Sequence, residues 1–266
     1  MSSQGQRATP PVHAVDTLTI GGELTVHRLG FGAMRLPGVR GAPRPSDARE
    51  LLRKVVTLGV DFIDTAHAYG RSEEMIADAL HPYPEGLVIA TKGGLRRGGD
   101  PDGRPERLRA DCETSLRRLR LDTIDLWQLH RIDPAVPLEE QVGAIQELRD
   151  EGKIRFAGVS EVSVEELGRV RALIEIATVQ NRFNIADQSA TDVLEACEAD
   201  GLGFLPWAPM GMGDLLGANG STDRSAATPA QTALAWLLRR SPVILPIPGT
   251  GSVEHLRENV GAARLA

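Results

Sequence analysis

The sequence predicts an α/β protein, a (β/α)8 TIM barrel with an N-terminal β-hairpin. Two observations lead to this prediction: eight apolar runs read as buried strands, and a segment with helical periodicity follows each of them. The connections are short and no linker or low-complexity tract interrupts the alternation, which favours one barrel over two domains. With 41% hydrophobic and 25% charged residues, the 266-residue chain can bury a sizeable core.

The N-terminal segment divides into a tail and a hairpin. Residues 1–16 are polar and contain Pro10 and Pro11, so we predict a mobile tail and no signal peptide. Residues 17–30, "TLTIGGELTVHRLG", hold two short β runs around adjacent glycines, which predicts a hairpin. We expect this hairpin to plug the bottom of a single barrel domain that spans residues 17–266.

The strands and helices then follow in order. Each predicted strand is a short apolar run, as in "VDFIDTA" and "LVIATKG". The first helix places Leu51, Leu52 and Val55 on one face, with Ser46 as a plausible N-cap and Gly59 as a C-cap. The predicted strands are 27–34, 60–66, 87–93, 123–130, 154–160, 177–183, 202–209 and 243–249. The predicted helices are 46–60, 72–80, 104–121, 137–153, 163–173, 189–201, 228–241 and 252–263.

An open doubly wound sheet is the alternative fold. It requires a glycine-rich dinucleotide turn between its first strand and first helix. The segment "GFGAMRLPG" contains Gly30, Gly32 and Gly38, but it lacks the G-x-G-x-x-G spacing and opens no helix. The closed barrel is therefore favoured.

Charge, hydrophobicity and cysteine content argue against several kinds of binding partner. The formal charge of −6 argues against nucleic acid, and no apolar run approaches the ~18 residues of a membrane span. Cys112 and Cys197 have no Cys or His at metal-ligand spacing, so we expect two buried free thiols and no metal. Such sparse cysteine use suits a cytoplasmic protein.

Polar side chains collect where three neighbouring strands end. Asp64 ends the second predicted strand and Tyr69 lies just beyond it, while Lys92 and His130 end the third and fourth. Active sites of these barrels lie at the carboxyl ends of the strands, so all four side chains should face one mouth. An ammonium lowers the pKa of a phenol, a carboxylate would hold that ammonium, and a neutral imidazole could orient a carbonyl. This set could protonate a developing alkoxide.

The motifs "DTAHAYG", "SEEMIADAL", "ATKGG", "QLHRID", "GKIRFAGVS", "VQNRFN" and "PIPGTGSVEHLREN" occur in this order. From about residue 17 to residue 263 the chain resembles the aldo-keto reductase family. The resemblance implies reduction of an aldehyde or ketone to an alcohol with NADPH, with NADH possible but weaker. It implies that Tyr69 is the proton donor, that Lys92 lowers its pKa and pairs with Asp64, and that His130 orients the carbonyl.

The resemblance also implies a set of cofactor contacts. Ser160 and Gln180 would hold the nicotinamide carboxamide, and Trp207 would stack on the ring. The other implied contacts are Gly32, Ala33, Met34 and Asp64, then Pro209, Met210, Gly211 and Gly213 beside the pyrophosphate, Gly249, Thr250, Ser252 and His255 around the ribose phosphate, and Glu258 and Asn259 at the adenine.

Three positions depart from the family pattern. Glu161 stands where the family has Asn, which puts one carboxamide contact in doubt. Many family members carry Lys and Arg where this chain has Gly249 and His255. We therefore expect a smaller preference for NADPH over NADH.

Two other functions remain open: a nicotinamide-binding redox sensor or regulatory subunit without significant turnover, and a barrel lyase or isomerase without a cofactor. The complete set of four polar side chains favours the enzyme. The C-terminal third looks most like the pyridoxal reductase branch of the family, which suggests pyridoxal as a substrate. We expect a monomer or weak homo-oligomer that acts on a small-molecule carbonyl.

Overall fold

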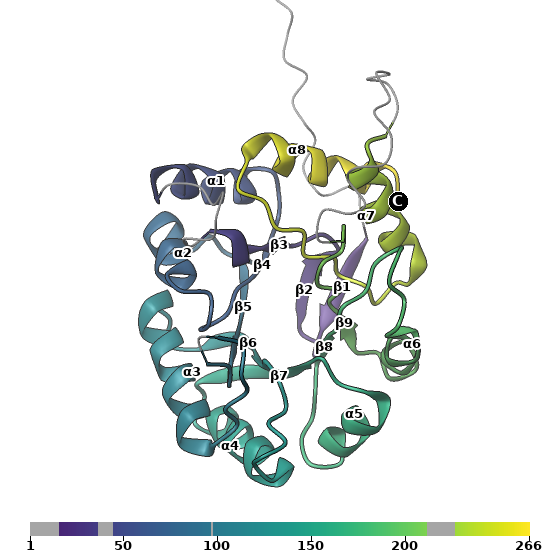
Figure 1. Cartoon of the computed structure of the whole chain (residues 1–266). Coiled ribbons are helices and arrows are strands. Elements are labelled where there is room, and N and C mark those ends of the chain that lie inside the picture. Colours follow the sequence, from purple (N-terminus) through teal and green to yellow (C-terminus); the bar gives the residue numbers. More distant parts are fainter. Residues whose placement is uncertain (1–15, 37–44, 97, 212–226) are drawn as a thin grey trace, which may run out of the picture.

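Seven parallel strands form a curled sheet in the order β3-β4-β5-β6-β7-β8-β9, so neighbours in sequence are neighbours in space. The computed structural model describes residues 16–36, 45–96, 98–211 and 227–266. Residues 1–15 of the predicted tail lie outside these ranges. Figure 1 looks into the ring of strands, with the helices arranged around it. The strands are β3 (Phe31–Gly32), β4 (Phe62–Asp64), β5 (Val88–Gly93), β6 (Ile124–Leu129), β7 (Ile154–Ser160), β8 (Thr178–Gln180) and β9 (Gly203–Phe204).

The eighth predicted strand, 243–249, closes the barrel as an irregular segment. On one side it exchanges two backbone hydrogen bonds with β9, of 2.8 and 2.9 Å. On the other side the carbonyls of Pro246 and Pro248 accept hydrogen bonds from Gly30 (2.9 Å) and Gly32 (3.2 Å). Proline has no N–H, so these two residues accept bonds from the β3 side and return none. The barrel prediction is confirmed, with a weaker ladder at its seam than the sequence suggested.

The helices of the described ranges lie where the sequence predicts them. Gly59 has φ +88° and its N–H donates to the Val56 carbonyl (2.9 Å), as expected for a C-cap. The first helix begins at Pro45, so Ser46 lies inside the helix and the N-cap prediction is wrong.

No helix within the described ranges is long and apolar enough to cross a membrane. The helices are α1 (Pro45–Thr57), α2 (Ser72–Leu80), α3 (Pro105–Leu119), α4 (Leu138–Asp150), α5 (Val164–Arg171), α6 (Thr191–Asp200), α7 (Pro229–Arg240) and α8 (Val253–Gly261), with short 3-10 turns η2 (Ala33–Arg35) and η3 (Ala262–Arg264).

The predicted N-terminal hairpin is present and packs against the bottom of the barrel. Strands β1 (Thr17–Ile20) and β2 (Leu24–His27) pair antiparallel. Gly21 and Gly22 turn the chain with φ values of +60° and +76°, which residues with a Cβ rarely adopt. Apolar hairpin side chains pack with residues from the amino ends of the strands in one cluster, which includes Leu18, Ile20, Leu24, Val26, Phe62, Val88 and Leu126.

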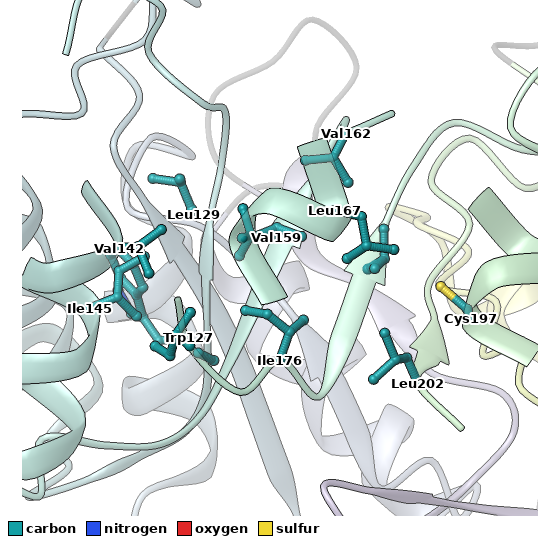
Figure 2. Packing of buried hydrophobic residues seen from close by; sticks show 14 of the residues in the cluster. Trp127, Leu129, Val142, Ile145, Val159, Val162, Leu167, Ile176, Cys197 and Leu202 are labelled. Carbon is teal, nitrogen blue, oxygen red and sulfur yellow. The ribbon is translucent and has the colours of Figure 1, made fainter. Parts of the chain in front are cut away.

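A second apolar layer joins the outside of the sheet to the surrounding helices. Figure 2 shows Trp127, Leu129 and Val159 from the strands facing Val142 and Ile145 of α4. This packing fixes the positions of β6 and β7, whose carboxyl ends enter the site described below.

Both cysteines lie in buried surroundings, as the sequence predicts. Cys112 and Cys197 are fully buried and form no disulfide. Burial raises the pKa of each thiol to about 12. Both side chains therefore stay protonated and act as small apolar groups in the core.

Arg28 reinforces the seam of the barrel. Its guanidinium is buried and donates to the carbonyls of Ile244 (3.1 Å), Leu238 (2.8 Å) and Ser241. The side chain comes from the loop before β3, and its partners lie at the end of α7 and at the start of the closing segment. One side chain thus ties the first and last parts of the barrel together.

We expect Arg28→Met to lower the free energy of unfolding by about 2–4 kcal/mol, because three buried carbonyls lose their donor. The midpoint of thermal unfolding, followed by circular dichroism, should fall by roughly 5–15 °C. Arg169→Met, which removes an exposed arginine from α5, is the matched control and should change the midpoint little. Equal midpoints for the two variants would contradict this role for Arg28.

Candidate active site

A pocket of about 400 Å3 opens at the carboxyl ends of the strands. It brings together most of the site residues predicted from the sequence. Those that line it are Gly32, Met34, Asp64, Tyr69, His130, Ser160, Gln180, Trp207, Pro209, Met210, Gly211 and Gly249. Five further residues that the sequence analysis did not single out also line it: Arg35, Leu95, Arg131, Ala208 and Ile247.

Some predicted residues lie outside this lining. Lys92 and Ala33 are fully buried behind it. The residues predicted for the ribose phosphate and the adenine, apart from Gly249, lie on α8 or just before it. They are Thr250, Ser252, His255, Glu258 and Asn259. Gly213 lies outside the described residues.

Asp64 and Lys92 form a buried ion pair beneath the pocket. Asp64 ends β4 and Lys92 lies in the neighbouring strand β5, so the parallel pairing brings them together. The Lys92 Nζ lies 2.8 and 2.7 Å from the two carboxylate oxygens and 2.7 Å from the Thr65 carbonyl oxygen. These contacts use all three N–H groups of the ammonium. The pair is therefore held in one geometry, as a buried charge pair must be to offset its desolvation.

Tyr69 lies above this pair. Its ring centroid is 5.2 Å from the Lys92 Nζ and 5.8 Å from the His130 ring, which it meets edge to face. Burial raises the pKa of Tyr69 above its ordinary value, and the positive charge of Lys92 opposes that rise. Lys92 thus lowers the phenol pKa as expected, but the net shift is upward because the loss of water outweighs the effect of the ammonium.

His130 is held at the end of β6 and stays neutral. Its backbone N–H donates to the Gly93 carbonyl (2.9 Å). Burial lowers the pKa of His130 to about 2, and the positive charges of Lys92 and Arg131 add to the effect. The ring Nδ1 has no hydrogen-bond partner among the described residues. A neutral imidazole can donate a hydrogen bond from one ring nitrogen to a carbonyl oxygen.

Ser160 and Gln180 present one donor and one acceptor to the pocket. The Gln180 Nε2 donates to Asp64 Oδ1 (2.9 Å), so the amide oxygen is left to accept. The Ser160 Oγ accepts a hydrogen bond from the Arg131 Nη1 (3.1 Å), so the hydroxyl proton is left to donate. A primary carboxamide needs this combination of partners.

Arg131 is a site residue that sequence reasoning missed. Its Nη1 also donates to the His130 carbonyl oxygen at 2.5 Å, so one guanidinium contacts the ends of both β6 and β7. A signal was available, because the residue directly follows the predicted histidine at a strand end.

Trp207 is held at the pocket wall by a residue whose role the sequence left in doubt. Its indole Nε1 donates to the Glu161 Oε1, which also accepts from the Arg182 backbone N–H (2.7 Å). Glu161 does not line the pocket. Its carboxylate is therefore engaged with Trp207 and does not enter the pocket beside Ser160 and Gln180.

Two glycines line the pocket where backbone segments approach closely. A Cβ on Gly32 would lie 2.6 Å from the Ile247 carbonyl oxygen, and one on Gly249 would lie 2.8 Å from the Gly32 carbonyl oxygen. Neither position can hold a side chain without a shift of the backbone. This gives a physical reason for Gly249 where many family members carry a lysine.

The amino end of α8 adjoins Gly249. Ser252 is the N-cap, and its Oγ accepts from the backbone N–H groups of Glu254 (3.2 Å) and His255 (3.4 Å). Thr250 Oγ1 accepts from the Ser252 N–H (3.0 Å). His255 is exposed in the first turn, where the helix dipole favours an anion, while the neighbouring Glu254 adds a negative charge.

The comparisons with known proteins agree with this fold. Residues 28–266 match the aldo/keto reductase family. The chain is 44% identical over 258 residues to an uncharacterized oxidoreductase of Schizosaccharomyces pombe, covering 91% of this chain and 83% of the relative. It is 40% identical over 268 residues to pyridoxine 4-dehydrogenase of Escherichia coli, covering 94% and 93%. An aldo/keto reductase from Klebsiella pneumoniae, solved in complex with NADP and acetate, matches with a TM-score of 0.80, 27% identity and coverage of 94% and 90%.

The matches extend over nearly the whole chain and include the strands that carry the predicted site. The predicted resemblance to the pyridoxal reductase branch agrees with the identity to pyridoxine 4-dehydrogenase. The prediction of an oxidoreductase is likewise confirmed. This chain belongs to the aldo/keto reductase family.

Proposed function

We propose that the chain reduces an aldehyde or ketone to the alcohol with NADPH, and that Tyr69 protonates the carbonyl oxygen. The observation that carries the proposal is the convergence of Tyr69, His130 and the Ser160–Gln180 pair on one pocket. NADPH, when bound, supplies the hydride that adds to the carbonyl carbon. The proton from Tyr69 completes the alcohol, so the charges balance.

The pocket fits a nicotinamide. Ser160 would donate to the carboxamide oxygen, and the amide oxygen of Gln180 would accept from the carboxamide nitrogen. Trp207 lines the pocket and offers it an aromatic ring. The NADP in the related Klebsiella structure supports the same choice.

Tyr69 is suited to the acid role because it holds its proton until charge develops. Its raised pKa keeps the phenol protonated at neutral pH. As the carbonyl oxygen gains negative charge, the phenol donates, and the Lys92 ammonium stabilises the phenolate that remains. His130, kept neutral, donates a hydrogen bond that orients the carbonyl. Asp64 contributes by holding Lys92 in place.

The preference for NADPH over NADH comes from the amino end of α8. The 2′-phosphate would meet the hydroxyl of Thr250 and the side chain of His255 near the positive end of the helix dipole. This chain has Gly249 where many family members have a lysine, so the preference for NADPH over NADH should be modest. One charge-assisted hydrogen bond to a phosphate corresponds to about tenfold in affinity or somewhat more.

Pyridoxal is the substrate that we propose first. The 40% identity to pyridoxine 4-dehydrogenase supports it. The pocket also suits a flat aromatic aldehyde, because Trp207 and Tyr69 line it together with the apolar side chains of Leu95 and Met210.

Purified protein should oxidise NADPH when 4-nitrobenzaldehyde or pyridoxal is added, and form one alcohol for each NADPH consumed. NADH should bind about tenfold more weakly, measured by quenching of tryptophan fluorescence. The assay follows the loss of NADPH absorbance and identifies the alcohol by chromatography. Binding of NADPH without turnover of either carbonyl would contradict the proposal and favour a redox sensor.

A further inference from the structure

We propose that Glu161 is a positioning residue that holds the indole of Trp207 at the angle needed to stack on the nicotinamide. The inference rests on the proposed function, since it takes Trp207 as the stacking partner. It assigns a role to a residue that lies outside the pocket lining.

The contacts of Glu161 converge on a single carboxylate oxygen. Glu161 Oε1 accepts from the indole Nε1 of Trp207 and from the backbone N–H of Arg182 (2.7 Å). Glu161 directly follows β7, Arg182 lies shortly after β8 and Trp207 lies shortly after β9. One side chain therefore links the ends of three successive strands.

Arg182 also holds the indole, through a contact over the ring. The Arg182 guanidinium carbon lies 5.6 Å from the centroid of the Trp207 ring, within cation–π range. Arg182 is absent from the active-site lining, and together with Glu161 it lines a separate hollow near the amino end of α6. The ring therefore contacts Arg182 while Trp207 itself lines the active-site pocket. The guanidinium is itself anchored by Asp187, at 2.9 Å.

The backbone of Glu161 is fixed in an uncommon conformation. Its φ is +57°, in the left-handed region that disfavours residues with a Cβ and tolerates asparagine best. Its own N–H donates to the Gln180 carbonyl (3.0 Å), which keeps this turn in register with β8. The residue with the uncommon backbone conformation is therefore also the one whose carboxylate binds Trp207. Uncommon backbone conformations often occur at functional sites.

The physical effect is preorganisation. A tryptophan at a pocket wall can rotate about two side-chain bonds, and cofactor binding would have to restrict that rotation. The Glu161 hydrogen bond restricts it beforehand. Loss of the bond should weaken only ligands that contain the nicotinamide.

The test compares two ligands on Glu161→Met, which keeps side-chain length and removes the acceptor. NADPH should bind about three- to tenfold more weakly, the contribution of one aromatic contact. 2′-Phospho-ADP-ribose has the phosphates and adenine but no nicotinamide ring, and its Kd should stay within twofold of the unmutated value. Glu161→Gln retains an acceptor oxygen and should restore most of the NADPH affinity. Glu165→Met, an exposed glutamate nearby in α5, should change neither ligand.

A spectroscopic readout reports the bond directly. In protein labelled with 15N-tryptophan, the indole resonance that Trp207→Phe removes should move upfield in Glu161→Met. A double-mutant cycle adds a second criterion: in the Trp207→Phe background, Glu161→Met should have no further effect on NADPH affinity.

The outcomes separate the two proposals. If the unmutated protein bound NADPH no better than 2′-phospho-ADP-ribose, the proposed stacking and the cofactor site would be wrong. If the unmutated protein preferred NADPH and Glu161→Met weakened both ligands equally, or neither, the positioning role would be overturned while the proposed function stood. A folding defect in Glu161→Met would show as a lower midpoint of thermal unfolding. In that case the test is made on Glu161→Gln, by its NADPH affinity and the position of its Trp207 indole resonance.

Discussion

Tyr69→Phe is expected to lower kcat by about 10²–10⁴-fold, the usual contribution of a general acid. The substitution removes one hydroxyl and keeps the ring that packs edge to face on His130. NADPH affinity should therefore stay within about twofold, since a single neutral contact at most is lost. Single-turnover kinetics with saturating NADPH would measure the chemical step apart from product release.

The chain supplies a matched control, because it has one other tyrosine. Tyr83 is half-buried, and its hydroxyl donates to the Leu119 carbonyl (2.7 Å), away from the pocket. Tyr83→Phe should leave kcat unchanged and cost some stability. Near-normal turnover by Tyr69→Phe would contradict the assignment of Tyr69 as the proton donor.

Lys92→Met should show the second large effect, with a kcat loss in the same 10²–10⁴ range. The substitution also leaves the buried Asp64 carboxylate without its cation, which should cost about 3–5 kcal/mol of stability. Kinetics and chemical denaturation would be measured on the same preparation.

The pH profile distinguishes loss of the ammonium from loss of the fold. Lys92 opposes the rise in the pKa of Tyr69, so its removal should raise that pKa further. The phenol would then keep its proton to higher pH, and the decline of carbonyl reduction at alkaline pH should move upward. Alcohol oxidation needs the phenolate as a base, so its rise with pH should move upward as well. If the alkaline decline of reduction occurred at the same pH in Lys92→Met and in the unmutated protein, this account of Lys92 would be contradicted.

The double variant Asp64→Asn with Lys92→Met provides the control for stability. Removing both charges avoids an unpaired buried carboxylate, so much of the lost stability should return. Activity should remain low, because the ammonium beside Tyr69 is still missing. Recovery of both properties together would mean that Lys92 matters only for folding.

The sequence by itself determined the alternation of strands and helices and the end of the barrel at which the site lies. Both follow from local patterns: apolar runs, helical periodicity, and polar residues at strand ends. Asp64, Tyr69 and His130 could be placed at one mouth on this basis, because neighbouring parallel strands bring their carboxyl ends together. The hairpin at Gly21 and Gly22 was equally local, since adjacent glycines supply the positive φ angles that the turn needs.

Only the tertiary structure decided the electrostatics and the contacts between distant segments. The net rise in the pKa of Tyr69 depends on how far the folded barrel excludes water, which no spacing of residues encodes. The bond from Trp207 to Glu161 joins residues 46 positions apart, and Arg28 reaches carbonyls more than 200 positions away. These pairings cannot be inferred from the sequence, because they form only when the barrel closes. Closure brings side chains of remote segments within hydrogen-bond distance.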